Sequence, residues 1–404
     1  MENKRTPEIR FPGYIGEWEE RKIGEFLTES RISGTNGLKA KKLTVKLWGK
    51  GVVPKDEIYQ GSEETKYYIR KAGQFIYGKL DFLHQAFGII PDNLDGYEST
   101  LDSPAFDIAD NLNSFFFLEY VSRKQFYLYQ GTIANGSRKA KRIHSDTFFN
   151  MPLIVPSVGE QTDIGTFFKK IDDAIALHQQ ELTILKQTKQ GFLQKMFPKE
   201  GESVPEVRFP GFTGEWEERK LGELGKIRSG IGFPDSEQGG RRGIPFYKVS
   251  DMNNIGNESE MLNSNNYVTN EQIKKNKWKP IEDVPSVIFA KVGAALMLNR
   301  KRLVTTPFFI DNNIMAFSFG ETWDMNFGYI LFQTLFFPRY AQVGALPSFN
   351  ASDIESINIK IPVKEEQTKI GNFFKQLDDM IALHQRELDA LKETKKAFLQ
   401  KMFV

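Results

Sequence analysis

The sequence predicts an α+β protein with an internal pseudo-twofold repeat. In this fold, two mixed α/β domains are separated by two long helices that form an antiparallel coiled coil. Three observations predict it. Two segments of the chain recur almost unchanged, the longer of them carries a heptad pattern, and the regions between the repeats alternate short apolar runs with turn residues.

Length and composition exclude several classes of protein. The 404 residues suggest two or three domains at about 150 residues each. A net charge of +2 excludes a globally basic nucleic-acid coat protein. The absence of cysteine removes disulfides, thiol nucleophiles and Cys-based zinc sites, and fits a cytoplasmic protein. The charged N-terminus does not read as a signal peptide, and no uncharged apolar run approaches the roughly 18 residues of a membrane span.

Two repeats define a constant frame. Residues 9–26 and 207–224 are identical at 13 of 18 positions, and residues 160–197 and 366–403 at 27 of 38. The regions between these repeats do not visibly match one another. A tandem duplication drifting neutrally is the alternative, but drift would have eroded frame and insert more evenly. We therefore interpret the frame as having the same function in both halves, while each insert recognises a different target.

The longer repeat predicts a coiled coil. Apolar residues follow a 4-3 spacing over five heptads, without proline until Pro198. About 35 residues at 1.5 Å rise make a rod of roughly 50 Å. The predicted seam comprises Ile164, Phe168, Ile171, Ile175, His178, Leu182 and Leu185, and Ile370, Phe374, Leu377, Ile381, His384, Leu388 and Leu391.

The polar seam positions favour antiparallel pairing. A parallel pair would stack Lys189 on Lys395, a like-charge layer. Antiparallel pairing centred on position 180 instead places each lysine opposite an apolar residue near an end of the rod. We expect its stem to be buried there and its ammonium to reach water.

The inserts have the alternation of mixed α+β domains. Strands are predicted within 72–80, 86–91 and 124–131 of the first insert, and within 244–251, 286–299 and 312–319 of the second. Buried helices are predicted at 113–124 and 325–337. Trp18 and Trp216, at matching frame positions, are predicted to plug a domain edge rather than stack on a ligand.

Catalytic signatures are missing. The sequence contains no phosphate-binding P-loop, no nucleophile elbow, no H-E-x-x-H and no Asn-Pro-Pro-aromatic tetrapeptide of the kind amino-methyltransferases use. His178 and His384 lie in the seam, and His84 and His144 stand alone. We therefore predict an adaptor with no catalytic, cofactor-binding or metal-ligating residues.

The frame resembles that of a known family. A proline followed by E-Q-x-x-I-G marks the start of each long helix (156–165 and 362–371). The motif W-E-E-R-K-[IL]-G-E marks the start of each insert. This arrangement closely resembles the specificity subunit of type I restriction-modification systems. The segments 79–88 and 246–251 also look like target recognition domain sequences.

The resemblance implies a non-catalytic role in DNA recognition. Each insert would be a target recognition domain reading one half of a bipartite, asymmetric site in double-stranded DNA, and the helices would set the unread spacer. Two methyltransferase subunits would bind the frame and methylate adenine with S-adenosylmethionine. Two restriction subunits would act as ATP- and magnesium-dependent motors. This chain itself would hold no cofactor and contact no membrane.

The corresponding division of the chain has five parts. We expect a first recognition domain with its frame motif (1–153), a central helix (154–197), a linker (198–206), a second recognition domain with its motif (207–359) and a C-terminal helix (360–404). A non-catalytic protein–protein scaffold is the main alternative. An autonomous DNA-modifying enzyme is a third possibility, which the missing motifs oppose.

Candidate DNA-binding residues come from basic clusters and from the segments resembling recognition domains. Local positive patches on a neutral chain suit phosphate neutralisation, although any single lysine is more often part of an ordinary solvated loop. The candidates are Lys79, Gln85, Arg138, Lys139, Lys141 and Arg142 in the first insert, and Arg241, Arg242, Lys248, Lys291, Arg300 and Arg302 in the second.

Overall fold

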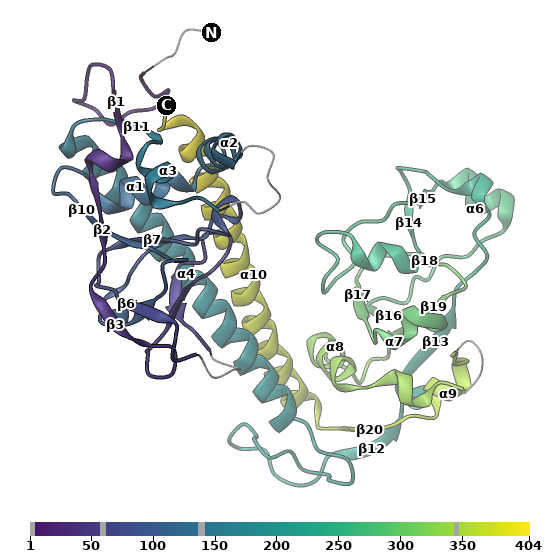
Figure 1. The fold of residues 1–404 in the computed structure, drawn as a ribbon. Coiled ribbons are helices and arrows are strands. Elements are labelled where there is room, and N and C mark those ends of the chain that lie inside the picture. The colour runs from purple at the N-terminus through teal and green to yellow at the C-terminus, as the bar shows by residue number, and fades with distance from the viewer. Residues whose placement is uncertain (1–4, 57–61, 136–141, 343–346) are drawn as a thin grey trace. The chain divides into compact units, whose positions relative to one another are not determined.

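The computed structural model describes residues 5–56, 62–135, 142–342 and 347–404. The chain divides into two compact units. The first unit comprises residues 1–180 and 385–404, and the second comprises residues 181–384. Each unit therefore contains one insert, the start of one long helix and the end of the other (Figure 1).

The first unit is built on two sheets and a short hairpin. Its four-stranded antiparallel sheet has the order β2-β10-β7-β8, beside the three-stranded sheet β3-β6-β9 and the pair β4-β5. Its strands are β1 (Glu19–Lys22), β2 (Leu27–Ser30), β3 (Ser33–Asn36), β4 (Leu43–Val45), β5 (Val52–Pro54), β6 (Lys66–Ile69), β7 (Phe75–Tyr77), β8 (Phe87–Ile89), β9 (Glu98–Ser99), β10 (Ala105–Ile108) and β11 (Pro152–Val155). Its short helices are η1 (Ile23–Glu25), η2 (Phe82–His84), η3 (Asp92–Leu94), α1 (Ser114–Ser122), α2 (Lys124–Asn135) and α3 (Ser145–Phe149).

The second unit repeats this plan with a different sequence. Its four-stranded antiparallel sheet has the order β13-β19-β16-β17, and a three-stranded sheet β15-β14-β18 lies beside it. Its strands are β12 (Glu217–Lys220), β13 (Gly225–Ser229), β14 (Ile244–Tyr247), β15 (Tyr267–Val268), β16 (Ser286–Ala290), β17 (Lys301–Val304), β18 (Phe309–Ile310), β19 (Ile314–Phe319) and β20 (Asn358–Ile361). Its short helices are α5 (Leu221–Leu224), η4 (Asp235–Glu237), η5 (Val249–Asn253), α6 (Asn270–Asn276), α7 (Gly293–Met297), α8 (Met325–Thr334), η6 (Phe337–Tyr340) and α9 (Ala351–Glu355).

Aromatic side chains fill both cores. In the first unit, Phe75 of β7 stacks on Phe148 at 5.7 Å between ring centroids and meets Phe117 of α1 edge-on at 4.9 Å. In the second, Phe317 of β19 packs on Phe332 of α8 at 4.9 Å. The helices predicted at 113–124 and 325–337 are confirmed as α1 and α8, each covering the four-stranded sheet of its own unit.

One predicted strand is wrong. Residues 124–131 belong to the helix α2. The aromatic run favoured a strand, but Phe126, Tyr127 and Gly131 are buried while Leu128 and Tyr129 are exposed, which is a helical rather than an alternating period. Gly131 allows this helix to approach closely, because a Cβ there would lie 2.5 Å from a Leu83 methyl carbon.

A second predicted strand is too long. The run 286–299 begins as β16 but turns into α7 after Ala290. Gly293 adopts φ +71°, a left-handed conformation that ends the extended backbone. The remaining predicted strands contain β7, β8, β14 and β19 and are confirmed.

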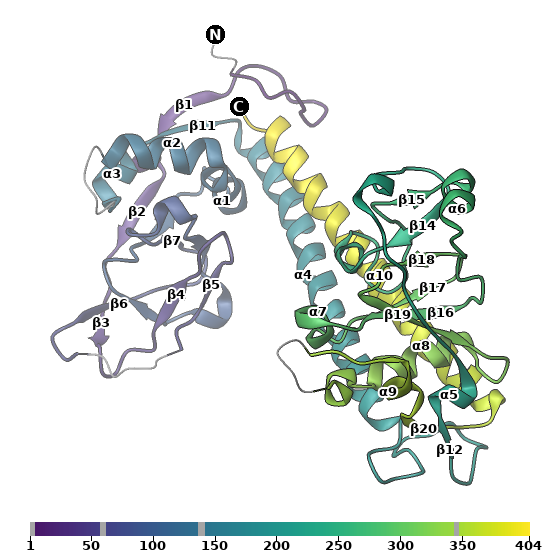
Figure 2. The same cartoon turned by 90° about the vertical axis from the view of Figure 1, so that its right-hand side faces the viewer.

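The two long helices, α4 (Val158–Lys195) and α10 (Lys364–Lys401), pair antiparallel within each unit (Figure 2). In the first unit, Phe167 meets Phe398 and Lys395 meets Asp172. In the second unit, Phe192 meets Phe373. Paired residue numbers sum to 565–567, against the 566 that pairing about position 180 predicts. The antiparallel coiled coil is confirmed, and all fourteen seam positions are buried or half-buried.

Candidate nucleic-acid interface

A two-stranded ribbon closes each insert. Strand β1 pairs antiparallel with β11, and β12 pairs with β20 in the equivalent register: Glu19 faces Val155, and Glu217 faces Ile361. The W-E-E-R-K motif thus pairs with the strand that leads into the long helix. We define the first insert as residues 23–151 and the second insert as residues 221–357, the segments between these paired strands.

A buried ion pair joins the frame motif to the helix start. Arg10 donates from Nε and Nη2 to both carboxylate oxygens of Glu160, at 2.6 and 2.7 Å, and none of the Glu160 side chain is exposed. Arg208 and Glu366 repeat this bidentate geometry at the same distances. Bidentate arginine–carboxylate pairs are strong and geometrically specific. The Glu of each E-Q motif is therefore the anchor of the frame motif.

The Gln and Gly of the same motif hold the insert. The Gln161 side-chain oxygen accepts from the backbone N–H of Asn113, the N-cap of α1, at 3.0 Å. Gln367 makes the same bond to Asp324, the N-cap of α8. Gly165 lies so close to this cap that a Cβ would be 2.2 Å from the Asn113 side-chain oxygen. The E-Q-x-x-I-G motif is thus a socket for the first turn of the buried insert helix.

Both frame tryptophans are buried, as predicted. Trp18 meets Phe116 of α1 and Phe403, beyond the end of α10, with ring centroids 5.8 and 6.2 Å away. Trp216 meets Phe327 of α8 and Phe197, beyond the end of α4, both at 5.9 Å. Each insert is therefore clamped between the start of one long helix and the end of the other.

The seam lysines pair with carboxylates, a feature the sequence did not predict, and each lysine side chain stays about 20% exposed. Lys189 bonds Asp378 at 2.5 Å, and Lys395 lies 2.7 Å from both Asp172 and Glu119. In the first unit His178 lies 3.5 Å from Glu387, and in the second His384 lies 3.1 Å from Glu181. Each carboxylate on a long helix stands next to the residue that antiparallel pairing places opposite the lysine or histidine.

The candidate DNA-binding residues of the first insert have different surroundings. Arg138, Lys139 and Lys141 lie outside the described residues. Arg142 is exposed and lies 3.3 Å from Asp102. Lys79 is half-buried, and burial lowers its pKa. Gln85 turns its amide onto the Ser122 carbonyl at 3.1 Å, so its side chain is partly used within the fold.

The second insert presents its candidates mainly from loops. Arg241 and Arg242 are exposed before β14, and no described carboxylate pairs with them. Lys248 reaches Gln238 at 3.1 Å, and Lys291, half-buried, follows β16. Arg300 bonds the Asn253 side chain.

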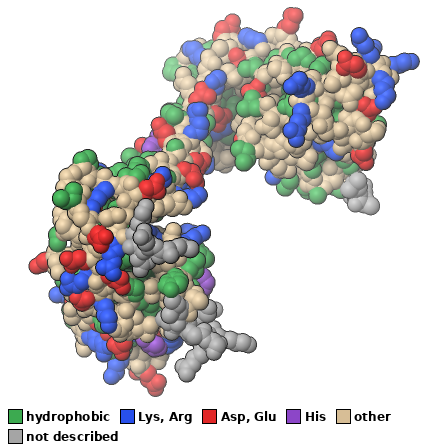
Figure 3. All heavy atoms as spheres, turned by 90° about the horizontal axis from the view of Figure 1, so that it is seen from above, with side chains coloured by type: hydrophobic (Ala, Val, Ile, Leu, Met, Phe, Trp, Pro, Cys, Tyr) green, Lys and Arg blue, Asp and Glu red, His purple; other side chains and the backbone are tan. Residues whose placement is uncertain are grey.

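Arg302 differs from the other candidates because it serves the fold. Its guanidinium donates to the carbonyls of Lys301 and Met252, and burial lowers its pKa. The neighbouring Lys301 is buried, bonds Asn299 and the Leu335 carbonyl, and has its pKa lowered to about 7 by burial. On the face that Figure 3 shows, basic and acidic side chains of the described residues are interspersed rather than gathered into a field of one sign.

Sequence reasoning missed an exposed aromatic residue. Trp48 stands between β4 and β5 with 57% of its surface exposed, and the exposed Lys46 and Lys50 lie two residues to either side. The signal was present in the hexapeptide K-L-W-G-K-G (46–51), which combines a large aromatic residue with two cations and two turn-forming glycines.

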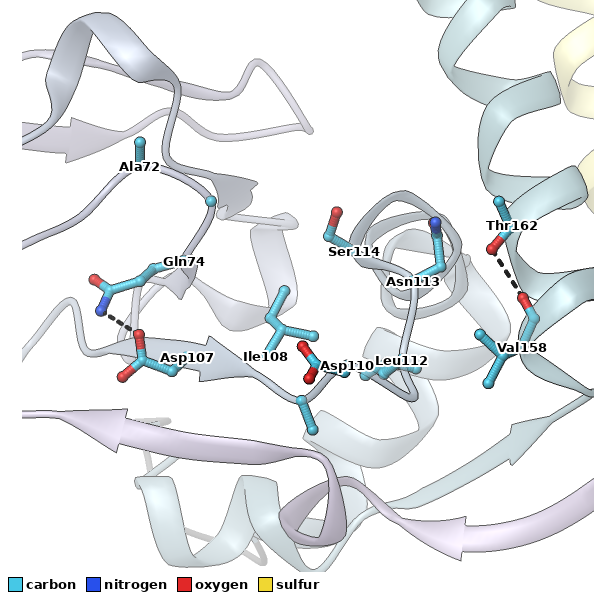
Figure 4. A pocket seen from close by; sticks show the side chains of 12 residues that line it. Ala72, Gln74, Asp107, Ile108, Asp110, Leu112, Asn113, Ser114, Val158 and Thr162 are labelled. Atoms are coloured by element: carbon cyan, nitrogen blue, oxygen red, sulfur yellow. Dashed lines mark hydrogen bonds between the residues drawn. The ribbon is translucent and has the colours of Figure 1, made fainter.

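A pocket of about 470 Å³ in the first unit offers no catalytic arrangement. It lies where β7 and β10 approach the start of α1 and of α4 (Figure 4). Its Asp107 accepts from Gln74 at 2.9 Å, and Thr162 bonds the Val158 carbonyl at 2.8 Å. Among the residues that line it, no histidine, cysteine or lysine faces a carboxylate as a base or nucleophile would. No helix in the described part of the chain is long and apolar enough to cross a membrane.

Comparisons with known proteins agree with this architecture. Residues 213–393 match the family described as type I restriction modification DNA specificity domain. The chain is 22% identical over 303 residues to the type I restriction enzyme MjaVIII specificity subunit of Methanocaldococcus jannaschii, covering 72% of this chain and 69% of that one. It is 23% identical to the putative MjaX specificity subunit of the same organism, covering 70% and 65%.

A solved structure shares the whole fold. The S subunit of a type I restriction-modification system from M. genitalium superposes with a TM-score of 0.64 over 99% of both chains, at 13% identity. The family match falls on the second insert and its helix, and the fold match extends over the first. The second part of the chain thus matches the type I restriction modification DNA specificity domain, and the whole chain shares its fold with the S subunit from M. genitalium.

Proposed function

We propose that each insert reads one half of a bipartite, asymmetric site in double-stranded DNA. The observation that carries this proposal is the contrast between frame and insert. The two inserts share a four-stranded sheet and an equivalent attachment to the helices, yet between the repeats their sequences show no visible match. A constant frame that holds two inserts of different sequence suits the recognition of two different half-sites.

The coiled coil sets the unread spacer in this proposal, and the frame binds the partners. Two pseudo-equivalent halves suit two methyltransferase subunits, with two restriction subunits completing the complex. Adenine methylation with S-adenosylmethionine and ATP-driven, magnesium-dependent motor activity belong to those partners, which act in the cytoplasm. This chain contributes sequence choice and no catalysis.

Exchange of one insert tests the assignment. Residues 23–151 are replaced by the equivalent insert of another specificity subunit, with both cuts at the insert end of the β1–β11 ribbon so that strand pairing and the Arg10–Glu160 anchor are kept. Methylated positions are then mapped across the genome of a cell that carries the chimera and its methyltransferase. We expect one half of the motif to change and the other half and the spacer to stay. A change in both halves contradicts independent reading.

Salt dependence separates this function from the protein–protein scaffold. A DNA reader in complex with its methyltransferase loses affinity for the motif duplex linearly in log–log plots against salt, because phosphate contacts release counterions. A scaffold binds the duplex no better than a scrambled one at any salt concentration. The test uses the assembled complex, with the methyltransferase alone as the control.

Matched insertions test the spacer mechanism. The antiparallel register places the junction 187/188 of α4 opposite the junction 378/379 of α10. A seven-residue heptad inserted at both junctions keeps the seam in register and lengthens the rod by about 10 Å, or about three base pairs. We expect the spacer to lengthen while both half-sites stay the same. An unchanged spacer in a folded variant refutes the ruler.

A further inference from the structure

The tip of the β4–β5 hairpin holds a tryptophan outward. Trp48 has φ +62°, a left-handed conformation that a bulky side chain rarely adopts. The residue is more than half exposed, and among the rings of the described residues it meets that of His84, at 5.4 Å between ring centroids. Burial of the ring therefore does not account for a residue of this size at the tip.

The tip is fixed to the rest of the first insert. The backbone N–H groups of Trp48 and Gly49 donate to the carbonyls of His84 and Gln85, at 2.8 and 3.0 Å. The Gln85 side chain in turn bonds the Ser122 carbonyl at the end of α1. Because these hydrogen bonds join the loop to the turn between β7 and β8, the backbone that carries Trp48 is held in place.

The charge around the ring suits a polyanion. Lys46 and Lys50 are exposed, and no carboxylate of the described chain pairs with either. Lys79 precedes the β7–β8 turn, and its backbone carbonyl accepts a hydrogen bond from the N–H of Ile143, next to Arg142. The acids at this edge already have partners, since Asp81 faces His84 at 3.4 Å and Asp102 faces Arg142 at 3.3 Å. An aromatic ring can stack on a base while the ammonium groups on either side of it pair with the neighbouring phosphates.

The second unit exposes apolar side chains at the turn that corresponds to the one to which the Trp48 backbone is bonded. The turn between β16 and β17, which corresponds to the β7–β8 turn, exposes Met297 and Leu298 between Lys291 and Arg300. In both units, exposed apolar side chains therefore lie among basic side chains at or beside this turn, although the two insert sequences are unrelated. Neutral variation gives no reason for this coincidence.

We propose that Trp48 packs its ring against the base stack of double-stranded DNA, opening one base step in the half-site read by the first insert. Apolar and aromatic side chains that enter a base step unstack it and make specificity depend on how easily that step deforms. This inference rests on the proposed function and adds to it a residue that reads DNA without hydrogen bonds to base edges.

The test compares Trp48→Ala, Trp48→Phe and Tyr129→Ala in the complex with the methyltransferase. Tyr129 is a matched control because it is an exposed aromatic residue, at 63%, on α2 of the same insert. The probe is a duplex carrying the motif methylated in cells, with 2-aminopurine at one position of the first half-site at a time. Affinity, its salt dependence and 2-aminopurine emission are measured, and thermal melting checks folding.

Wild-type complex is expected to change 2-aminopurine emission at one step, and Trp48→Ala to return it to the free-duplex value. Affinity should fall about five- to 150-fold with an unchanged salt slope, since stacking and not charge is lost. Trp48→Phe should recover most of the affinity, and Tyr129→Ala should match wild type.

Two results overturn the inference. In one, Trp48→Ala binds the duplex and changes emission as wild type does. In the other, it loses only the methyltransferase, which assigns the ring to a protein partner. If wild-type complex itself fails to prefer the motif duplex, it is the proposed function that fails.

Discussion

At the base of the first insert, Lys395 bonds two carboxylates, Asp172 of α4 and Glu119 of α1. At the equivalent place in the second unit, Lys189 bonds Asp378 of α10, and Ile330 of α8 stands where the first insert has Glu119. The helix-borne aspartate is common to both units, whereas the insert-borne residue differs. The seam cation is satisfied by the frame itself, so the insert beside it is free to vary.

The same rule holds at the other attachment points. Glu160 bonds the frame arginine, Gln161 bonds backbone, and Gly165 lies against the N-cap of the insert helix, and their repeats at 366, 367 and 371 make the equivalent contacts. Contacts to the insert backbone and to its N-cap residue restrict the amino acid at few positions of the insert. The frame can thus hold two unrelated inserts with one set of bonds.

The largest expected effect comes from the shared anchor. Arg10→Ala leaves the Glu160 carboxylate buried without its partner, which costs about 3–5 kcal/mol of unfolding free energy. Arg208→Ala should cost the second unit a similar amount through Glu366. Denaturant unfolding, followed by proteolysis of each unit, measures both. The double variant Arg10→Met, Glu160→Met should recover much of the loss, and equal damage in it would contradict a charge-based cost.

Glycines within one helix provide the next contrast. Gly165→Ala drives a Cβ into the α1 cap and should cost about 1–3 kcal/mol. Gly191→Ala, in the same helix with nothing within 4 Å of the added carbon, should stabilise by about 0.5–1 kcal/mol because alanine is the better helix former. Thermal melting of both variants gives the sign directly. The socket assignment fails if the two changes have the same sign.

The acid found in only one unit predicts a pH dependence there. Burial raises the pKa of the Glu119 carboxyl to about 7, above its ordinary 4.5. The folded state therefore holds this proton more tightly, and its stabilising contribution is present at low pH and lost as pH rises from about 4.5 to 7. Glu119→Gln should remove that slope from the melting temperature of the first unit. Ile330→Val in the second unit is the control, which should keep the wild-type slope.

The smallest expected effects separate surface cations from structural ones. Arg241→Ala and Arg242→Ala should each lower the salt slope of DNA binding by about one if they contact phosphate, with unchanged melting. Arg302→Ala should lower the melting temperature instead, because its guanidinium bonds two backbone carbonyls. Measuring slope and melting on the same preparations distinguishes the two roles. A reduced slope with unchanged melting for Arg302→Ala would place that residue on DNA.

The sequence by itself determined the repeat, the seam and its antiparallel direction. These features depend on local spacing, since heptad periodicity and the Lys189–Lys395 clash can be read without knowing what packs where. It also predicted α1 and α8, whose apolar runs are long enough for a buried helix. The frame motifs were visible as repeats, but their contacts were not.

The tertiary structure alone decided which residues meet. Arg10 and Glu160 are 150 positions apart, and no local pattern links them. The run 124–131 became a helix because its burial follows the packing of α2 on η2, which overrides the strand preference of its aromatic residues. The seam lysines found carboxylates because the antiparallel register brings Asp172 and Asp378 beside them. The exposure of Trp48 and the burial of Trp18 were likewise decided by the packed chain.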